Sequence, residues 1–86
     1  MLQDKVTLTA PHGMHARPAG ELVKLVKSLD GKIRLTAGEK SVDAASMLAL
    51  LTLGLKSGTE IVVTAEGGDE SGNLRRVTEF IAAIKD

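Results

Sequence analysis

The sequence predicts an α+β domain in which four short strands form one sheet and three helices cover one face of that sheet. Segments that alternate apolar and polar residues, typical of half-buried strands, take turns with segments whose apolar residues recur every three or four positions, typical of amphipathic helices. Their order is β-α-β-β-α-β-α, which makes a two-layer sandwich. The length of 86 residues suffices for one compact domain, 1–86, and not for two.

The first half of the chain contains two strands and one helix. Residues 6–10 alternate apolar and hydroxyl side chains, which predicts a strand that the turn residues 11–13 end. A helix follows, and Gly31 is expected to stop it. Residues 32–37 alternate again and predict the second strand. The apolar residues of the helix share one face: Ala19, Leu22, Val23, Val26 and Leu29.

A hairpin and a short helix follow in the middle of the chain. Residues 38–39 are a two-residue loop signal that leads into a third strand over 41–44. Ser46 is suited to cap a helix over residues 47–53, because its hydroxyl can accept from a free amide of the first turn. Gly54 is expected to end this helix.

The last third holds the most apolar strand and the last helix. Residues 60–65 are expected at the centre of the sheet because of their apolar character. Asp69 is suited to cap a helix with an apolar stripe, although residues 72–73 are poor helix formers that could let its first turn fray. The stripe consists of Leu74, Val77, Ile81 and Ile84, with Phe80 beside it. Four residues of the uncovered sheet face are expected to meet water: Thr7, Thr9, Arg34 and Thr64.

The composition argues against several classes of function. Eleven basic and eleven acidic residues cancel, and one Phe is the only aromatic residue, so neither a basic face nor a stacking platform for nucleic acid is indicated. The absence of Cys excludes disulfides, thiol nucleophiles and Cys-based zinc sites. The start of the chain does not lead into a signal-peptide core, and the longest apolar run, near 47–51, is too short to span a membrane. A cytoplasmic location is therefore expected, with no membrane insertion.

The most informative segment is residues 13–19, Gly-Met-His-Ala-Arg-Pro-Ala. His15 falls where the first loop becomes the first helix, and the free amides and dipole of a helix start attract anions. Arg17 adds a fixed positive charge with donors suited to phosphate oxygens. Pro18 has no amide hydrogen and preorganises the first turn. Imidazole titrates near neutral pH, so a nucleophilic neutral ring is available at a site that would stabilise a phosphoryl group.

Two simpler interpretations of the same residues exist. His15 could be an exposed loop residue and Arg17 an ordinary surface charge. His12 and His15 could also bind a metal, but no Cys or nearby acid completes a ligand set. The spacing His-x-Arg-Pro at a strand-to-helix junction favours phosphate chemistry over both, with His12 as a loop residue beside the site.

The segment 13–19 also resembles the active-site signature of HPr, the histidine-containing phosphocarrier of the bacterial phosphoenolpyruvate-dependent sugar phosphotransferase system. The likeness covers the whole chain. Residues 6–11, 40–48, 52–59 and 65–70 are similar to further segments of that family, in the same order and spacing.

The resemblance implies a fold and a mechanism. The fold would be an open-faced β-sandwich with an antiparallel sheet. Enzyme I, phosphorylated from phosphoenolpyruvate, would donate to Nδ1 of His15, which would pass the group to sugar-specific IIA components. Arg17 would be the charge partner, and the backbone amides of Ala16 and Arg17 would hold phosphate oxygens. The chain would be a carrier without a cofactor rather than an enzyme, because its partners would supply the catalysis.

The resemblance further implies a partner-binding surface on the first and second helices. We expect Met47, Leu48 and Leu51 to be partly exposed and Leu50 to be buried. Gly20 departs from the family, many members of which carry a larger residue there. The matching positions in this chain are Gly20, Lys24, Lys27, Met47, Leu48 and Leu51.

Ser46 and the biological branch leave alternatives open. In some bacterial lineages a dedicated kinase phosphorylates the serine that matches Ser46, whereas helix capping alone also accounts for a serine here. The chain could equally be a related carrier of a nitrogen or carbon-storage branch. A domain of another class, which binds a small anion non-covalently through His15 and Arg17, is the remaining alternative.

Overall fold

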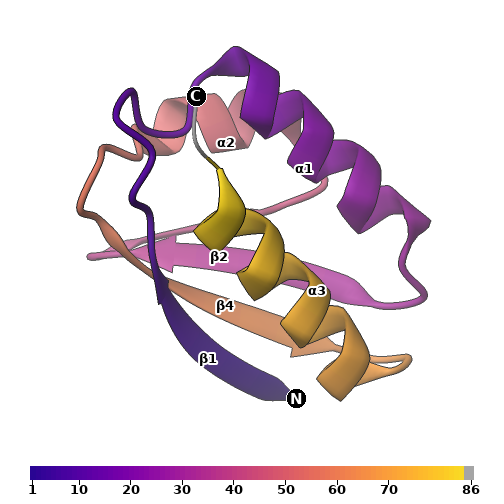
Figure 1. Ribbon diagram of the computed structural model, residues 1–86. Helices are drawn as coiled ribbons and strands as arrows, with labels where there is room; N and C mark the ends of the chain where they lie inside the picture. The colour runs from indigo at the N-terminus through magenta and orange to yellow at the C-terminus, as the bar shows by residue number, and fades with distance from the viewer. Residues whose placement is uncertain (85–86) are drawn as a thin grey trace.

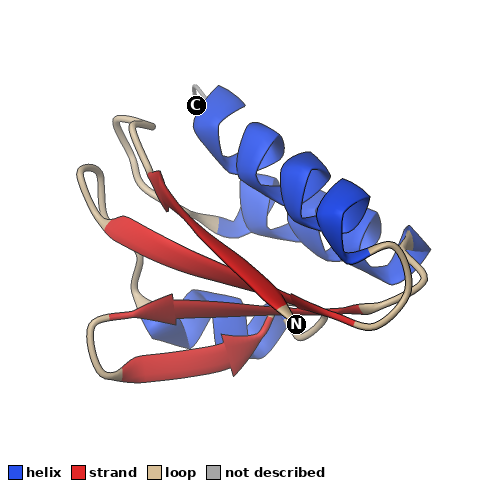
Figure 2. Ribbon diagram, turned by 90° about the horizontal axis from the view of Figure 1, so that it is seen from below, coloured by secondary structure: helices blue, strands red, loops and turns tan. Residues whose placement is uncertain are grey.

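The computed structural model describes residues 1–84, so the last two residues of the single domain expected over 1–86 lie outside the described part. One sheet forms a layer, and helices cover one of its faces (Figures 1 and 2). The expected fold class and element order are confirmed. The elements are β1 (Leu2–Thr7), α1 (Ala16–Ser28), β2 (Lys32–Ala37), β3 (Lys40–Asp43), α2 (Met47–Leu53), β4 (Glu60–Glu66) and α3 (Glu70–Ala83).

The sheet is antiparallel throughout, in the order β1-β4-β2-β3, so the apolar strand β4 is central as predicted. Its register places Leu35 opposite Val63, and both side chains are fully buried against the helices. Burial of large aliphatic side chains is the main stabilising term, roughly 1.5–3 kcal/mol for each one. The largest fully buried side chains are Leu8, Leu22, Ile33, Leu35, Leu50, Ile61, Ile81, Val63 and Val77.

The first strand differs from its predicted bounds, because it spans Leu2–Thr7 rather than 6–10. Pairing with β4 defines it, and this pairing begins at Leu2 opposite Ala65. Beyond Thr7 the chain leaves the ladder but remains bonded to the turn before β4. The amide of Leu8 donates to the carbonyl of Thr59 at 2.9 Å, and the amide of Gly58 donates to the carbonyl of Leu8 at 2.6 Å. The alternation of apolar residues over 6–10 therefore reflects the burial of Leu8 and Ala10, whereas only the first two residues of this segment pair with β4.

The predicted turns and caps of the middle segment are confirmed. Residues 38–39 form the loop of the β2–β3 hairpin, with φ of +61° at Gly38. The third strand spans Lys40–Asp43, so it begins and ends one residue before its predicted bounds, and Ala44 is buried in the core. Ser46 Oγ accepts from the amide of Ala49 at 3.3 Å, and Gly54 ends α2 in the left-handed region. The hydroxyl supplies a partner for a first-turn amide that the helix cannot satisfy itself.

Two predictions about the end of α1 and the start of α3 are wrong. Helix α1 ends at Ser28, so Gly31 does not stop it. Gly31 instead lies against the β4–α3 loop, where a Cβ would overlap the carbonyl oxygen of Gly67. The first turn of α3 is anchored rather than frayed. Asn73 is 4% exposed and its Nδ2 donates to Asp30 Oδ1 at 2.8 Å.

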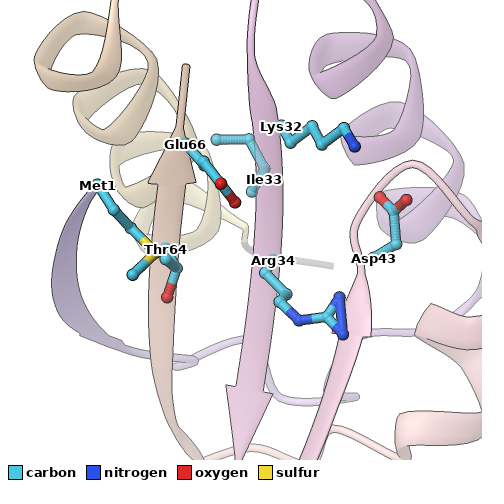
Figure 3. Close-up of a pocket in the computed structure, with 7 residues that line it drawn as sticks. All are labelled: Met1, Lys32, Ile33, Arg34, Asp43, Thr64 and Glu66. Atoms are coloured by element: carbon cyan, nitrogen blue, oxygen red, sulfur yellow. The ribbon is translucent and has the colours of Figure 1, made fainter.

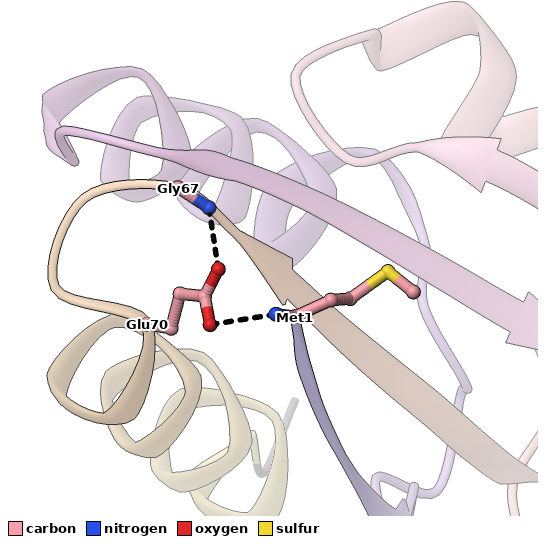
Figure 4. A network of polar contacts seen from close by, with 3 residues as sticks. All are labelled: Met1, Gly67 and Glu70. Carbon is pink, nitrogen blue, oxygen red and sulfur yellow. Dashed lines mark hydrogen bonds and ion pairs between the residues drawn. The ribbon is translucent and has the colours of Figure 1, made fainter.

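A polar contact joins the start of β1 to the start of α3 (Figure 4). The amino group of Met1 lies 2.9 Å from Glu70 Oε1, while Glu70 Oε2 accepts from the amide of Gly67 at 2.8 Å. The hydrogen bond from the Met1 amine, followed by that from Gly67, lowers the pKa of the Glu70 carboxyl. This contact holds one edge strand against the helix layer.

Candidate functional site

His15 occupies the N-cap of α1, at the loop-to-helix junction expected from the sequence. Its backbone is extended, with φ of −94° and ψ of −172°, and its carbonyl accepts the first helical hydrogen bond from the amide of Ala19 at 3.0 Å. The side chain makes no capping hydrogen bond and is half-buried. The backbone of His15 therefore fixes the position of the ring at the helix start, and the ring nitrogens are not used to cap the helix.

The first turn of α1 presents two free amides. Among residues 1–84, neither Ala16 nor Arg17 donates its amide hydrogen to another residue, and Pro18 has none to donate. Pro18 is buried at the third helical position, which suits its fixed φ and secures the turn. Two unpaired N–H groups at the positive end of the helix dipole make this turn a place for an anion.

Arg17 and His12 flank this turn. The Arg17 side chain is exposed and forms no ion pair with any residue of the described chain, so its guanidinium is available to a ligand. The rings of His12 and His15 lie with their centroids 6.3 Å apart and their planes at 72°. In residues 1–84 no three His, Cys, Asp or Glu side chains gather closely enough to hold a metal ion.

The loop before His15 is held by the segment after α2. The amide of Met14 donates to the carbonyl of Leu55 at 3.0 Å, and the Met14 side chain is 5% exposed in the core. Gly13 has φ of +69°, and a Cβ there would overlap the Leu55 carbonyl oxygen. Sequence reasoning missed this support. Gly13 was a signal that the loop is tight, but nothing local to it indicates which distant segment it contacts.

The expected partner-binding residues lie on two helices in contact with each other, because α1, which begins directly after His15, packs against α2. On α2 the predicted division is confirmed: Leu48 is 74% exposed and Leu51 40% exposed, Met47 is half-buried, and Leu50 is fully buried. On α1, Lys24 and Lys27 are exposed and Gly20 is half-buried. We call these residues the α1–α2 face: Gly20, Lys24, Lys27, Met47, Leu48 and Leu51.

The α1–α2 face is apolar on α2 and basic along α1. Helix α2 carries no charged residue, and α1 carries Arg17, Lys24 and Lys27 against a single acid, Glu21. Such a surface is complementary to a protein with an apolar patch beside acidic residues, and the charges would accelerate the encounter.

A separate hollow of about 250 Å³ lies on the uncovered face of the sheet (Figure 3). Lys32, at the start of β2, is one of its lining residues and follows the C-terminal end of α1. His15 lies at the other end of α1, directly before its first residue. Two basic residues, Lys32 and Arg34, and two acidic residues, Asp43 and Glu66, line it, so their side-chain charges balance. We do not assign it to the site at His15.

No helix among residues 1–84 combines the length and apolar character needed to cross a membrane.

Comparisons with known proteins agree on one family. A family model described as "PTS HPr component phosphorylation site" matches residues 2–83. Phosphocarrier protein HPr of Buchnera aphidicola from Acyrthosiphon pisum is 46% identical over 85 residues, 99% of this chain and 100% of that protein. The HPr of Vibrio cholerae is 37% identical over 86 residues, 100% of this chain and 96% of that one. A solved histidine-containing phosphocarrier protein from Mycoplasma superposes with a TM-score of 0.89 at 27% identity, over 99% of this chain and 100% of that one.

Proposed function

The chain belongs to the HPr family, the phosphocarriers of the bacterial phosphotransferase system, and from this premise we propose that it carries a phosphoryl group on His15 between two proteins. Enzyme I, phosphorylated from phosphoenolpyruvate, is the donor, and sugar-specific IIA components are the acceptors. The protein acts in the cytoplasm as one domain, and its partners supply the remaining catalytic groups.

The observation that carries this proposal is the unused ring of His15 at the start of α1. A lone pair on Nδ1 of the neutral imidazole attacks the phosphorus of a phosphohistidine on the donor. The P–N bond of the donor breaks as the new P–N bond forms, and the donor ring retains the electron pair of the broken bond. The amides of Ala16 and Arg17 then face the phosphoryl oxygens, so the helix start stabilises the charged product.

The openness of the site suits a carrier that must also release the group. Arg17 is exposed, and water and salt weaken the attraction between exposed charges. The phosphorylated state is therefore stabilised only modestly. Transfer in either direction then depends on the partner, because neither end state of the carrier is deeply favoured.

The α1–α2 face is the proposed docking surface for both partners. It includes the helix that begins directly after His15, exposes Leu48 and Leu51, and carries Lys24 and Lys27, with Arg17 at the start of the same helix. Ser46 lies at the edge of this face as the cap of α2. A kinase that phosphorylated Ser46 would add negative charge beside the apolar surface of α2, and we expect this modification to weaken docking.

Incubation with Enzyme I and radiolabelled phosphoenolpyruvate tests the function. The native chain should gain an acid-labile label that a IIA component removes, and His15→Ala should gain none. His12→Ala is the matched control, because it removes the neighbouring ring and leaves His15 in place. A native chain that binds phosphate but gains no covalent label would instead favour the non-covalent anion-binding alternative.

A further inference from the structure

Gly20 is the one glycine of this chain that its own fold does not require. Of the nine glycines, six have positive φ, which strains any other residue. Two more are needed for other reasons. A Cβ on Gly31 would overlap the carbonyl oxygen of Gly67, and one on Gly72 would displace the capping carboxylate of Asp69. The six with positive φ are Gly13, Gly38, Gly54, Gly58, Gly67 and Gly68.

Gly20 has neither constraint. It lies within α1 with no positive φ, and the heavy atom nearest to a Cβ placed on it is Cε of Met47, at 3.9 Å. This is an ordinary van der Waals distance, so alanine fits without any movement. Alanine also favours a helix interior over glycine. The isolated protein would therefore be at least as stable with a side chain at this position, and any reason for its absence lies outside the monomer.

The position of Gly20 on α1 places it where another protein could contact it. It follows His15 by five residues, which is about 7.5 Å along the helix axis. Gly20, Lys24 and Lys27 are spaced to share one side of α1, the side that meets Met47 of α2. A protein that brings a reactive side chain to His15 therefore comes near enough for a neighbouring side chain to reach Gly20.

We propose that Gly20 is a specificity-determining residue. Its missing side chain leaves a notch, with the Met47 methyl group beneath it, that receives an apolar side chain of the protein exchanging phosphoryl groups with His15. The neighbours of the notch set the chemistry of that partner. Leu48 and Leu51 extend the apolar surface, while the basic residues of α1 favour carboxylates beside the inserted side chain. The inference rests on the proposed carrier function.

The test measures phosphotransfer from phosphorylated Enzyme I at varied carrier concentration. Gly20→Leu fills the notch and should raise KM by at least about tenfold, the scale at which loss of one central contact is felt. The value of kcat should stay within about twofold, because His15, Arg17 and the free amides are unchanged. Gly20→Ala, whose methyl group fits against Met47, should show a smaller rise in KM with a thermal unfolding midpoint no lower than that of the native chain. Ser71→Leu adds the same bulk on an exposed part of α3 and should leave KM unchanged.

The outcomes separate this inference from the carrier function. If the native chain is labelled on His15 and Gly20→Leu has the native KM, the notch is not used and this inference is overturned while the carrier function stands. If the native chain gains no label at all, the carrier function fails, and the inference fails with it. Should Gly20→Leu unfold, Gly20→Ala decides, because a native KM with a raised unfolding midpoint would also overturn the inference.

Discussion

The amide of Met14 donates to the carbonyl oxygen of Leu55 at 3.0 Å, which ties the residue before His15 to the segment that follows α2. The contact spans 41 positions of the chain. It holds the residue before His15 against the segment that follows the C-terminal end of α2, so one backbone contact fixes the start of α1 relative to that end of α2. The consequences of this arrangement can be tested by substitution.

Gly13→Ala should damage both stability and phosphotransfer. The position has φ of +69°, and the added Cβ overlaps the Leu55 carbonyl oxygen. A loss of roughly 1–3 kcal/mol in the free energy of unfolding is expected from the strained backbone. Urea unfolding measures this loss, and phosphotransfer under conditions where the variant remains folded measures the displacement of His15. Native values in both assays would show that the loop tolerates a side chain there.

Arg17→Gln should slow phosphotransfer without changing stability. The guanidinium is exposed and unpaired within residues 1–84, so its removal should alter the free energy of unfolding by less than about 0.5 kcal/mol. Its loss removes the fixed charge nearest the phosphoryl group and should reduce the rate and its dependence on salt. Stopped-flow phosphotransfer at two ionic strengths measures both effects. A variant with an unchanged rate would remove Arg17 from the proposed site.

Ser46→Ala should destabilise the protein by about 1 kcal/mol, because the amide of Ala49 loses the hydroxyl that accepts its hydrogen bond. Ser46→Asp keeps a capping oxygen and should preserve the free energy of unfolding, but its charge stands beside the apolar α2 surface. We therefore expect Ser46→Asp to raise the KM of the carrier with Enzyme I. If both variants transfer phosphate as the native chain does, Ser46 has no influence on docking.

Leu48 and Leu50 form a matched pair on α2 that separates docking from folding. Leu50 is fully buried, so Leu50→Ala should cost roughly 2–5 kcal/mol in the free energy of unfolding. Leu48 is 74% exposed, so Leu48→Ala should cost less than about 0.5 kcal/mol. Calorimetric titration with Enzyme I should nevertheless show weaker binding for Leu48→Ala. Unaltered binding by that variant would place the docking surface elsewhere.

Stability should fall with acidification because two carboxylates accept hydrogen bonds in the folded protein. Donation from the Asn73 side chain, followed by that from the Asp69 amide, lowers the pKa of Asp30 below its ordinary value of 3.8. The Met1 amine and the Gly67 amide lower that of Glu70 below 4.5. Between the lower folded pKa values and these ordinary values, the unfolded chain binds more protons than the folded chain. The stabilisation that these carboxylates give at higher pH is therefore lost as the pH falls through this window.

Urea unfolding at pH 7, 5, 4 and 3 measures this dependence. Asp30→Asn and Glu70→Gln should each be less stable at pH 7 and lose less stability between pH 5 and 3 than the native chain. Glu39→Gln, in the hairpin loop, serves as the control, because this carboxylate bonds to no other residue of the described chain. An acid response in either test variant as steep as the native one would mean that its carboxylate does not contribute.

The helix caps illustrate which contacts can be predicted from neighbouring residues in the sequence. Ser46 and Asp69 were predictable as caps because each hydroxyl or carboxylate bonds an amide three residues ahead, a contact that is encoded within one turn. The β2–β3 hairpin was predictable for the same reason. Asn73 was misjudged, because propensity describes it as a poor helix former, whereas its side-chain amide donates to the carboxylate of Asp30, 43 positions away.

The sequence by itself determined the order of the elements, the central place of β4 and the position of His15 at the start of a helix. These follow from periodicity and turn chemistry, which act over a few residues. Only the tertiary structure decided where β1 begins, why Gly31 and Gly13 lack side chains, and which distant segment holds the loop before His15. Each of these depends on backbone groups that meet across the fold, and no local pattern specifies such a partner.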